Sequence, residues 1–336
     1  RAYRDNGPGH HNRSRFLKDL GLYWQIDSWD GSEFSIGSHG VRPTINSYIY
    51  GSAVAIAKIS ELAGKAEVAA LFRQEANILK QHMQEKLWDT KDQFFKVLRD
   101  HRATGNYPNK QEEKCSSGSL VGVRELYGYA PWYFNMPDAG KGYEAAWAQL
   151  VDPQGFQGKF GPGFAERRHP KFFINGGGCI WSGSSWPLAT SQTLTALANV
   201  LNNYEQDEVG KQAYFDTLRA YTRSHQLTLD DGTVVPWVDE SLNQDTGRWI
   251  MVGRYPKTRG RYYNHSSYCD LIITGLVGLR PRADDVVEVN PLLPDNTWDW
   301  FCLDNVVYRG RNLTILWDRT GEKYNRGKGL SVFVDG

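Results

Sequence analysis

Two acidic segments of the chain share a setting that suits acid–base chemistry. Residues 236–247 read PWVDESLNQDTG, in which Glu240 comes shortly after a tryptophan. Residues 21–37 read GLYWQIDSWDGSEFSIG, in which Asp30 stands between a tryptophan and a Gly-Ser pair. An acid held against an aromatic surface keeps its proton more readily, whereas a better solvated carboxylate stays ionised and can activate water. Glycoside hydrolysis needs this pair of roles, although helix caps and surface turns are the plain alternative.

Several aromatic and polar residues of the loops are candidates for binding a sugar. The chain has 12 Trp and 18 Tyr, and an indole face can stack on the C–H face of a sugar ring or pack in the core. An arginine at the entrance to a helix can hold a carboxylate, either of the protein or of an acidic substrate. The predicted substrate-binding residues are Trp29, Glu33, Arg42, Trp181, Trp186, Trp237, Asp239, Tyr263 and His265.

Some of these assignments have competitors within the sequence. Asp27 and Glu33 lie in the same loop as Asp30 and are alternative candidates for the acid. Asp239 is equally well explained as a turn residue, and His265 as part of a helix cap.

Composition argues against several other functions. The net charge is +1, so no strongly basic or acidic surface points to nucleic acid or a membrane. No apolar run reaches 18 residues, and no membrane-spanning helix is expected. The four cysteines are scattered, which argues against a zinc ribbon or a disulfide scaffold. Phosphate-loop, dinucleotide-binding, HExxH and GxSxG motifs are absent. We therefore predict no metal and no cofactor, and assign neither a compartment nor an oligomeric state.

Hydrophobic periodicity predicts paired helices with long polar loops between them, followed by strands. The predicted helices cover 13–22, 45–64, 65–88, 142–152, 187–203, 208–227 and 264–279, and the strands cover 286–293, 300–310, 312–319 and 330–335. Helical hairpins with loops gathered at one end suggest a mainly α protein, an (α/α)6 toroid. Because such a barrel has twelve helices and about seven are found, we expect its C-terminal half with a short C-terminal β-strand tail. Residues 1–281 would form the catalytic barrel domain, with N-terminal helices outside this sequence, and 282–336 a β tail packed on the barrel.

Four segments, in order along the chain, resemble glycoside hydrolase family 63 and its mannosylglycerate-hydrolase-like relatives among the six-hairpin glycosidases. Residues 29–32 (WDGS) are similar to the segment that carries the general acid of that family. Residues 240–247 (ESLNQDTG) are similar to its Glu-Asn-Tyr-Asn-Pro-x-Thr-Gly segment, which carries the general base. Residues 179–187 (CIWSGSSWP) resemble a segment of the sugar pocket, and 263–310 resemble the closing helix and β tail.

Six positions depart from the pattern of the family, among them Trp29 in the acid segment and Ser241 and Leu242, which stand in place of Asn-Tyr in the base segment. Gln244 replaces a proline in the base segment, Ser182 replaces an arginine in the pocket segment, and Glu33 stands where proline is common. These differences bear on the substrate more than on the chemistry.

The resemblance implies that Asp30 is the general acid and Glu240 the general base of an inverting enzyme, with carboxyl groups about 6.5–9.5 Å apart. We therefore expect an exo-acting O-glycosyl hydrolase that cleaves a small α-linked glucoside or mannoside and whose partner is a small oligosaccharide or glycoside. A polysaccharide lyase or sugar epimerase on the same barrel is the alternative enzyme. A non-catalytic carbohydrate-binding protein is the alternative outside enzymes.

Overall fold

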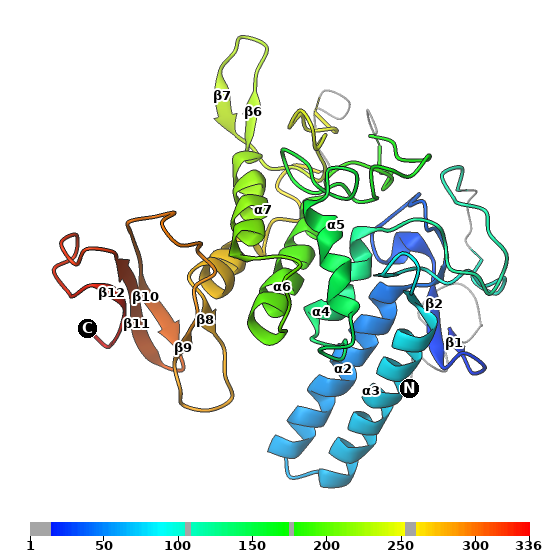
Figure 1. The fold of residues 1–336 in the computed structure, drawn as a ribbon, viewed down its shortest axis with the longest axis horizontal. Helices are drawn as coiled ribbons and strands as arrows, with labels where there is room; N and C mark the ends of the chain where they lie inside the picture. Colours follow the sequence, from blue (N-terminus) through cyan, green and yellow to red (C-terminus); the bar gives the residue numbers. More distant parts are fainter. Residues whose placement is uncertain (1–14, 105–108, 175–177, 253–259) are drawn as a thin grey trace.

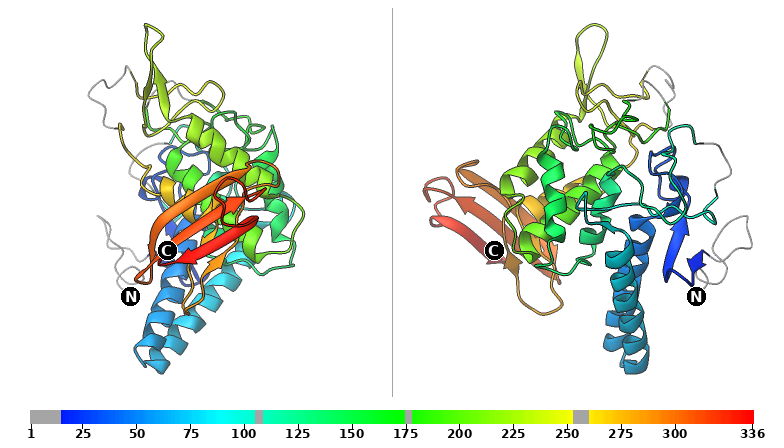
Figure 2. Two further views of the ribbon diagram at one scale, coloured as in Figure 1. Left: turned by 90° about the vertical axis from the view of Figure 1, so that its left-hand side faces the viewer. Right: turned by 45° about the vertical axis from the view of Figure 1, so that its right-hand side comes forward.

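The computed structural model describes residues 15–104, 109–174, 178–252 and 260–336. Figure 1 shows the hairpin of α2 and α3 projecting downward from a central group of helices and the C-terminal sheet to the left of that group, as does the right-hand view in Figure 2. The helical elements are η1 (Asp27–Trp29), α2 (Pro43–Leu62), α3 (Ala66–Lys86), η2 (Leu126–Tyr129), α4 (Ala130–Tyr133), η3 (Tyr143–Trp147), α5 (Ala148–Val151), α6 (Pro187–Asn203), α7 (Lys211–Arg223), α8 (Tyr268–Asp270) and the π-helical η4 (Leu271–Leu276).

Strands form five small antiparallel sheets in the described part of the chain. The strands are β1 (Phe16–Leu17), β2 (Leu22–Gln25), β3 (Gly40–Val41), β4 (Trp88–Asp89), β5 (Phe94–Phe95), β6 (Gln226–Thr228), β7 (Val234–Pro236), β8 (Leu279–Arg280), β9 (Glu288–Val289), β10 (Trp300–Tyr308), β11 (Arg311–Asp318) and β12 (Gly329–Val334). The larger sheets have the orders β1-β2-β3 and β10-β11-β12.

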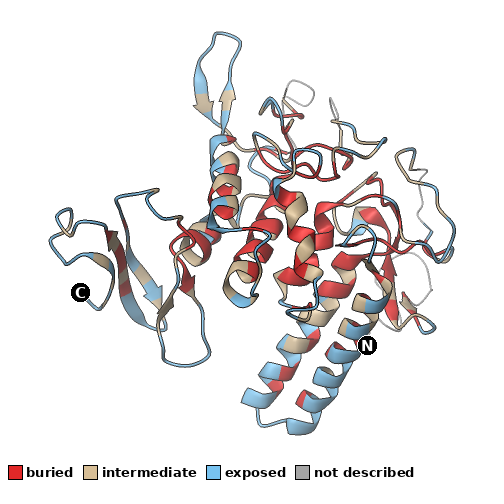
Figure 3. Ribbon diagram, viewed as in Figure 1, coloured by how far each residue is buried: buried red, intermediate tan, exposed pale blue. Residues whose placement is uncertain are grey.

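The two longest helices form the predicted antiparallel hairpin. Pro43 opens α2 at its first turn, where the missing N–H costs no hydrogen bond. Gly64 follows the end of α2 with φ +69°, a conformation that glycine adopts without strain, and so closes the helix. Figure 3 shows the far end of the hairpin exposed and its near end buried against the rest of the molecule.

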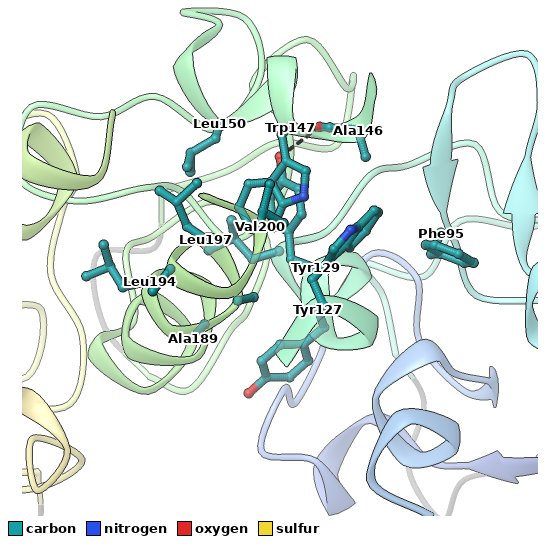
Figure 4. Close-up of a cluster of buried hydrophobic side chains, with 14 of the residues drawn as sticks. Phe95, Tyr127, Tyr129, Ala146, Trp147, Leu150, Ala189, Leu194, Leu197 and Val200 are labelled. Atoms are coloured by element: carbon teal, nitrogen blue, oxygen red, sulfur yellow. Dashed lines mark hydrogen bonds between the residues drawn. The ribbon is translucent and has the colours of Figure 1, made fainter. Parts of the chain in front are cut away.

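The core lies where α4 and α6 pack together, and α2 contacts α4 while α7 contacts α6. Tyr129 stacks on Trp147 with ring centroids 4.1 Å apart, and its hydroxyl donates to the carbonyl of Ala146 (Figure 4). Trp132 is fully buried beside them. This aromatic cluster fixes the short helices between the two long hairpin helices and α6.

The C-terminal sheet is a three-stranded antiparallel meander of β10, β11 and β12, whereas β9, from the first predicted strand, pairs with β8 in a separate sheet. β11 pairs with both β10 and β12, and a register shift between Leu303 and Val306 marks a bulge in β10. Leu313 and Ile315 of β11 are both buried, and alternate residues of a strand point to the same face. This face of the sheet is therefore turned toward the rest of the protein.

The predicted fold class is wrong, because the described residues do not form a helical toroid. Only α2, α3, α6 and α7 are longer than ten residues in the described part of the chain. Residues 16–25 form a β-hairpin rather than a helix, 143–151 form a short 3-10 helix and one helical turn, and 268–276 form a short helix that continues as a π-helix.

The physical cause of the error is the length of these three segments. A pattern of two or three turns matches helical periodicity by chance, and a helix that short is not stable without tertiary contacts. At the first segment, Gly21 has φ +67° and closes a turn between two strands instead.

The core position of α6 predicts a large and local effect on stability. Leu194→Ala should lower the free energy of unfolding by about 2–5 kcal/mol, because Leu194 is fully buried and its loss leaves a cavity. The same substitution at Leu62, which is 90% exposed, should change it by less than about 0.5 kcal/mol. Denaturant unfolding of both variants measures the difference, and equal losses would contradict the packing described here.

Candidate active site

Asp30 lies in the loop that connects two paired strands, β2 and β3. β2 and β3 pair through Trp24 and Val41, so the ends of the loop are fixed to each other. The loop starts with the 3-10 turn η1, and Asp30 is the residue that ends this turn. Gly31 follows with φ +70°, where any side chain would be strained. The chain therefore reverses directly after Asp30 and leaves its carboxyl group at a sharp turn.

Three donors converge on the carboxylate of Asp30. Nε of Arg42 donates to Oδ2 at 2.7 Å, and Oγ1 of Thr44 donates to the same oxygen at 2.5 Å. Oγ of Ser32 donates to Oδ1 at 2.6 Å. The hydroxyl of Tyr127 also donates to the backbone carbonyl of Asp30 at 3.0 Å. The side chain is thus held in one orientation, although 9% of it stays exposed.

Arg42 is buried and binds carboxylates of the protein itself, which is one of the two roles that its position in the sequence allows. Its Nη2 donates to Oγ of Ser32 at 2.8 Å and lies 3.9 Å from Oε2 of Glu125. Burial by itself lowers the pKa of the guanidinium, but the charges of Asp30, Glu125 and Asp27 outweigh this and raise it above its usual value. Arg42 is therefore a fixed positive charge among three carboxylates.

Glu125, just before η2, is a site residue that the sequence did not reveal. It is buried, and Oε1 accepts a hydrogen bond from the backbone N–H of Gly37 at 2.7 Å. Burial raises the pKa of this carboxyl to about 7; Arg42 and the N–H of Gly37 oppose the rise, and Asp30 and Asp27 add to it. No local motif marks Glu125, because its partners are 88 and 83 residues away in the sequence.

Asp27 is buried behind Asp30 and is also held by several partners. Its Oδ1 lies 3.3 Å from Nδ1 of His39, and its Oδ2 accepts from Nδ2 of Asn109 at 3.3 Å. A carboxyl group with no exposed surface cannot reach a leaving oxygen. Asp27 is thus placed to support the loop.

Asp30 opens onto a cleft of about 590 Å³. Its walls are formed by Arg15, Gln25, Trp29, Asp30, Gly31, Thr44, Ile45, Tyr48, Tyr127, Leu188 and Gln192. Trp29 is 41% exposed, and the guanidinium of Arg15 lies 3.0 Å from the centre of its ring. The hydroxyl of Tyr48 accepts from Nε2 of Gln192 at 2.7 Å, and burial raises the pKa of Tyr48 to about 12. Aromatic walls with a few polar groups suit a small polyhydroxylated ligand.

The loop that carries Glu240 is held by buried polar contacts. Asp239 has no exposed surface, and its Oδ1 accepts from the backbone N–H of Glu240 at 2.8 Å. Gly260 lies directly against this pair, since a Cβ there would stand 2.3 Å from Oδ1 of Asp239 and 3.0 Å from Cβ of Glu240. Trp237 is half-buried under the guanidinium of Arg261, 4.2 Å from its ring centre. Asp239 therefore acts on the shape of the loop.

His265 supports the same loop. Its Nε2 lies 2.8 Å from the carbonyl oxygen of Asp239, which can only accept, so Nε2 carries the proton. Nδ1 then accepts from the hydroxyl of Tyr221 at 2.9 Å while the ring is neutral. Burial lowers the pKa of His265, which favours this neutral form, although Asp239 opposes the shift. Tyr263 is 52% exposed and lies outside this network.

Trp181 and Trp186 pack inside the protein. They stack with ring centroids 3.9 Å apart, and their exposed fractions are 2% and 1%. Both belong to the main hydrophobic core, in which Trp181 also contacts Tyr127 and Phe164. Neither ring has the free face that stacking on a sugar requires.

Main-chain contacts connect three of the four segments that resemble the family. The N–H of Trp181 donates to the carbonyl of Glu33 at 3.0 Å, which joins the pocket segment to the acid loop. Ser185 and Leu242 exchange two hydrogen bonds of 2.9 and 3.0 Å, which joins the pocket segment to the base loop.

The thiol of Cys179, in the pocket segment, contacts the acid loop. It donates to Oε2 of Glu33 at 3.2 Å. Burial raises its pKa, and the charges of Glu33 and Glu240 raise it further. Asp30 lines the cleft, whereas Glu33 and Glu240 are not among the described residues of its walls.

Within the described residues, no group of three His, Cys, Asp or Glu side chains could hold a metal ion. No helix in that part of the chain is long and apolar enough to cross a membrane. The arrangement offers carboxyl groups, hydroxyls and aromatic faces.

The structure thus presents a cleft with a firmly held carboxyl group, linked through one segment to a second acidic loop. Residues 10–266 match the family described as mannosylglycerate hydrolase MGH1-like glycoside hydrolase domain, and 279–336 match the glycosyl hydrolase family 65 C-terminal domain. The chain belongs to the MGH1-like glycoside hydrolase family, as the resemblance of its motifs predicts.

Two solved structures are similar to the chain. One is named "Sialidase"; it is 45% identical over 95% of this chain, with a TM-score of 0.83, and the chain spans 28% of its length. The other is an uncharacterized conserved protein from Thermus thermophilus; it is 14% identical, with a TM-score of 0.47, and the match covers 70% of this chain and 46% of that one.

The buried carboxyl of Glu125 should make stability depend on pH. Its pKa of about 7 exceeds the ordinary value of 4.5, so its protonated form is favoured in the folded state. Its contribution is complete below pH 4.5 and is lost as pH rises through 7, by about 3 kcal/mol in total. Glu125→Gln should remove this decline, as measured by denaturant unfolding between pH 4.5 and 8.

The matched control is Glu85→Gln, because the side chain of Glu85 is 66% exposed. This control should follow the wild-type pH dependence. A Glu125→Gln profile that falls as steeply as the wild type would contradict the assignment.

Proposed function

We propose that the chain carries the acid–base machinery of an inverting, exo-acting glycoside hydrolase for small α-linked glucosides or mannosides. Asp30 is the general acid and Glu240 the general base. The observation that carries the proposal is the carboxyl group of Asp30, which faces the cleft and is held by Arg42, Thr44 and Ser32. Membership of the glycoside hydrolase family supports the reaction class.

The hydrogen bonds of Asp30 suggest which oxygen carries the proton. Oδ2 accepts from two donors, one of them charged, so protonation there would oppose both. Oδ1 accepts only from Ser32 among the described residues, and a hydroxyl can reverse its role and accept instead. In the proposed mechanism Oδ1 gives its proton to the departing glycosidic oxygen. Arg42 and Thr44 then stabilise the carboxylate that remains.

Glu240 is proposed to remove a proton from the water that attacks the opposite face of the sugar. Inversion requires room for this water between the two carboxyl groups. The contacts of Ser185 with Leu242 and of Trp181 with Glu33 support the approach of the two loops. Buried Asp239 and the His265–Tyr221 pair would set the orientation of the base loop.

A second substrate class is favoured by one comparison and one residue. The 45% identical structure is named a sialidase, and sialic acids carry a carboxylate. Arg15 lines the cleft beside Trp29 and is a cation that such a carboxylate could meet. The substrate panel should therefore contain a 4-nitrophenyl sialoside beside the α- and β-glucosides and mannosides. If the enzyme cleaves the sialoside but not the α-glucosides and α-mannosides, its substrate is a sialoside rather than the one proposed.

Substitution of Asp30 and substitution of Glu240 should lower kcat/KM with a different dependence on the leaving group. Asp30→Asn should lower kcat/KM by about 10²–10⁴-fold on a methyl or sugar leaving group, and by much less on dinitrophenyl, which departs without protonation. Glu240→Gln should cause a similar loss on both, because the water needs its base in either case. Steady-state kinetics on both substrates measure the contrast.

Glu33→Gln is the matched control, since Glu33 lies three residues from Asp30 and is the alternative acid. Its kcat/KM should stay within about threefold of the wild type on both leaving groups. If Glu33→Gln shows the leaving-group contrast and Asp30→Asn does not, the general acid is Glu33.

The stereochemistry of the product tests the mechanism independently. Proton NMR of a fast reaction on an α-glycoside should show the β-anomer first, because a single displacement by water inverts the anomeric carbon. First release of the α-anomer would mean retention through a covalent intermediate and would exclude Glu240 as a base for direct water attack.

A further inference from the structure

A second pocket, of about 470 Å³, lies between α7 and the C-terminal sheet. Trp298, Phe301 and Trp317 line it from the sheet side, and Lys211 from the first residue of α7. It shares no lining residue with the cleft of Asp30. In Figure 1 the sheet and the acid loop lie on opposite sides of the central helices, so the pocket is remote from the candidate active site.

Two indole rings give this pocket a fixed aromatic wall. Trp298 is 41% exposed, and its ring meets that of Phe215 on α7 edge-on, at 5.9 Å between centroids. Trp317 is half-buried, and its Nε1 donates to the backbone carbonyl of Trp298 at 3.2 Å. Because both rings are already held, a ligand that stacks on them loses little side-chain entropy.

Polar groups of both signs surround the aromatic wall. Lys211, Asp295 and Asn296 line the pocket, and none of these side chains has a hydrogen-bond or ion-pair partner among the described residues. Arg319 also lines it and forms an ion pair with Asp299 at 2.7 Å. A purely apolar ligand would leave these groups without partners, and a strongly charged ligand would meet charges of its own sign.

We propose that this pocket binds a neutral oligosaccharide at a site separate from the catalytic cleft. A pyranose offers a C–H face for the indole of Trp298 and hydroxyls that both donate and accept. Lys211 donates, Asp295 accepts, and Asn296 does both, which matches the hydroxyls of a sugar. Asn296 has φ +60° in a turn, a backbone conformation that asparagine tolerates.

The test is a titration with three defined hexasaccharides: maltohexaose, mannohexaose and cellohexaose. The full chain carries Glu240→Gln so that hydrolysis does not consume the probe, and binding is followed by calorimetry. At least one probe should bind saturably, and Trp298→Ala should weaken this binding about tenfold or more. Asp30→Asn should leave it unchanged, which separates the pocket from the cleft.

Trp300→Ala is the matched control, because Trp300 is also exposed, at 50%, on the same sheet but does not line the pocket. It should change affinity by less than about twofold. If circular dichroism shows that Trp298→Ala is unfolded, the double variant Asp295→Ala and Asn296→Ala replaces it with the same expectation. Binding of none of the probes, equal loss in the control, or loss in Trp29→Ala alone would overturn the proposal.

Discussion

The ion pair of Arg42 with Asp30 is the contact on which the candidate site depends. A guanidinium with 1% exposure cannot remain charged without partners, because moving a charge out of water costs several kcal/mol. Asp30, Ser32 and Glu125 supply those partners from two separate loops. Since Arg42 is itself fixed between β3 and the first turn of α2, its charge ties the acid loop to the most regular helix of the protein.

The positive charge of Arg42 acts on two carboxyl groups that have different surroundings. Asp30 receives the direct ion pair and faces the cleft, whereas Glu125 lies 3.9 Å from the guanidinium and is buried. Burial therefore dominates at Glu125 and holds its proton to about pH 7. A protonated Glu125 leaves most of the attraction of Arg42 to Asp30, and an ionised Glu125 would share it. The charge state of the buried Glu125 therefore affects how strongly Arg42 attracts the carboxylate of Asp30.

Long, regular features could be predicted from the sequence, and contacts between distant loops could not. The periodicity of 45–64 and 65–88 is long enough to identify α2 and α3, and the strands at 300–310 and 312–319 appear as β10 and β11. The toroid failed because it counted short patterns as full helices. Glu125 could not be predicted, because its properties come from burial and from the contact with Arg42, and no local sequence motif indicates either.

The tryptophans show why residue type alone does not identify a sugar site. Trp29, Trp181 and Trp186 all sit in segments rich in Gly and Ser, and the sequence assigned all of them to substrate. Small residues beside an indole also allow backbone to pack closely around a buried ring, and that is the arrangement at Trp181 and Trp186. Trp298 lies in the segment assigned to the β tail and was not assigned to substrate, yet it is as exposed as Trp29, at 41%. Stacking on a sugar needs a ring that is both held in place and open on one face, and these conditions follow from tertiary packing.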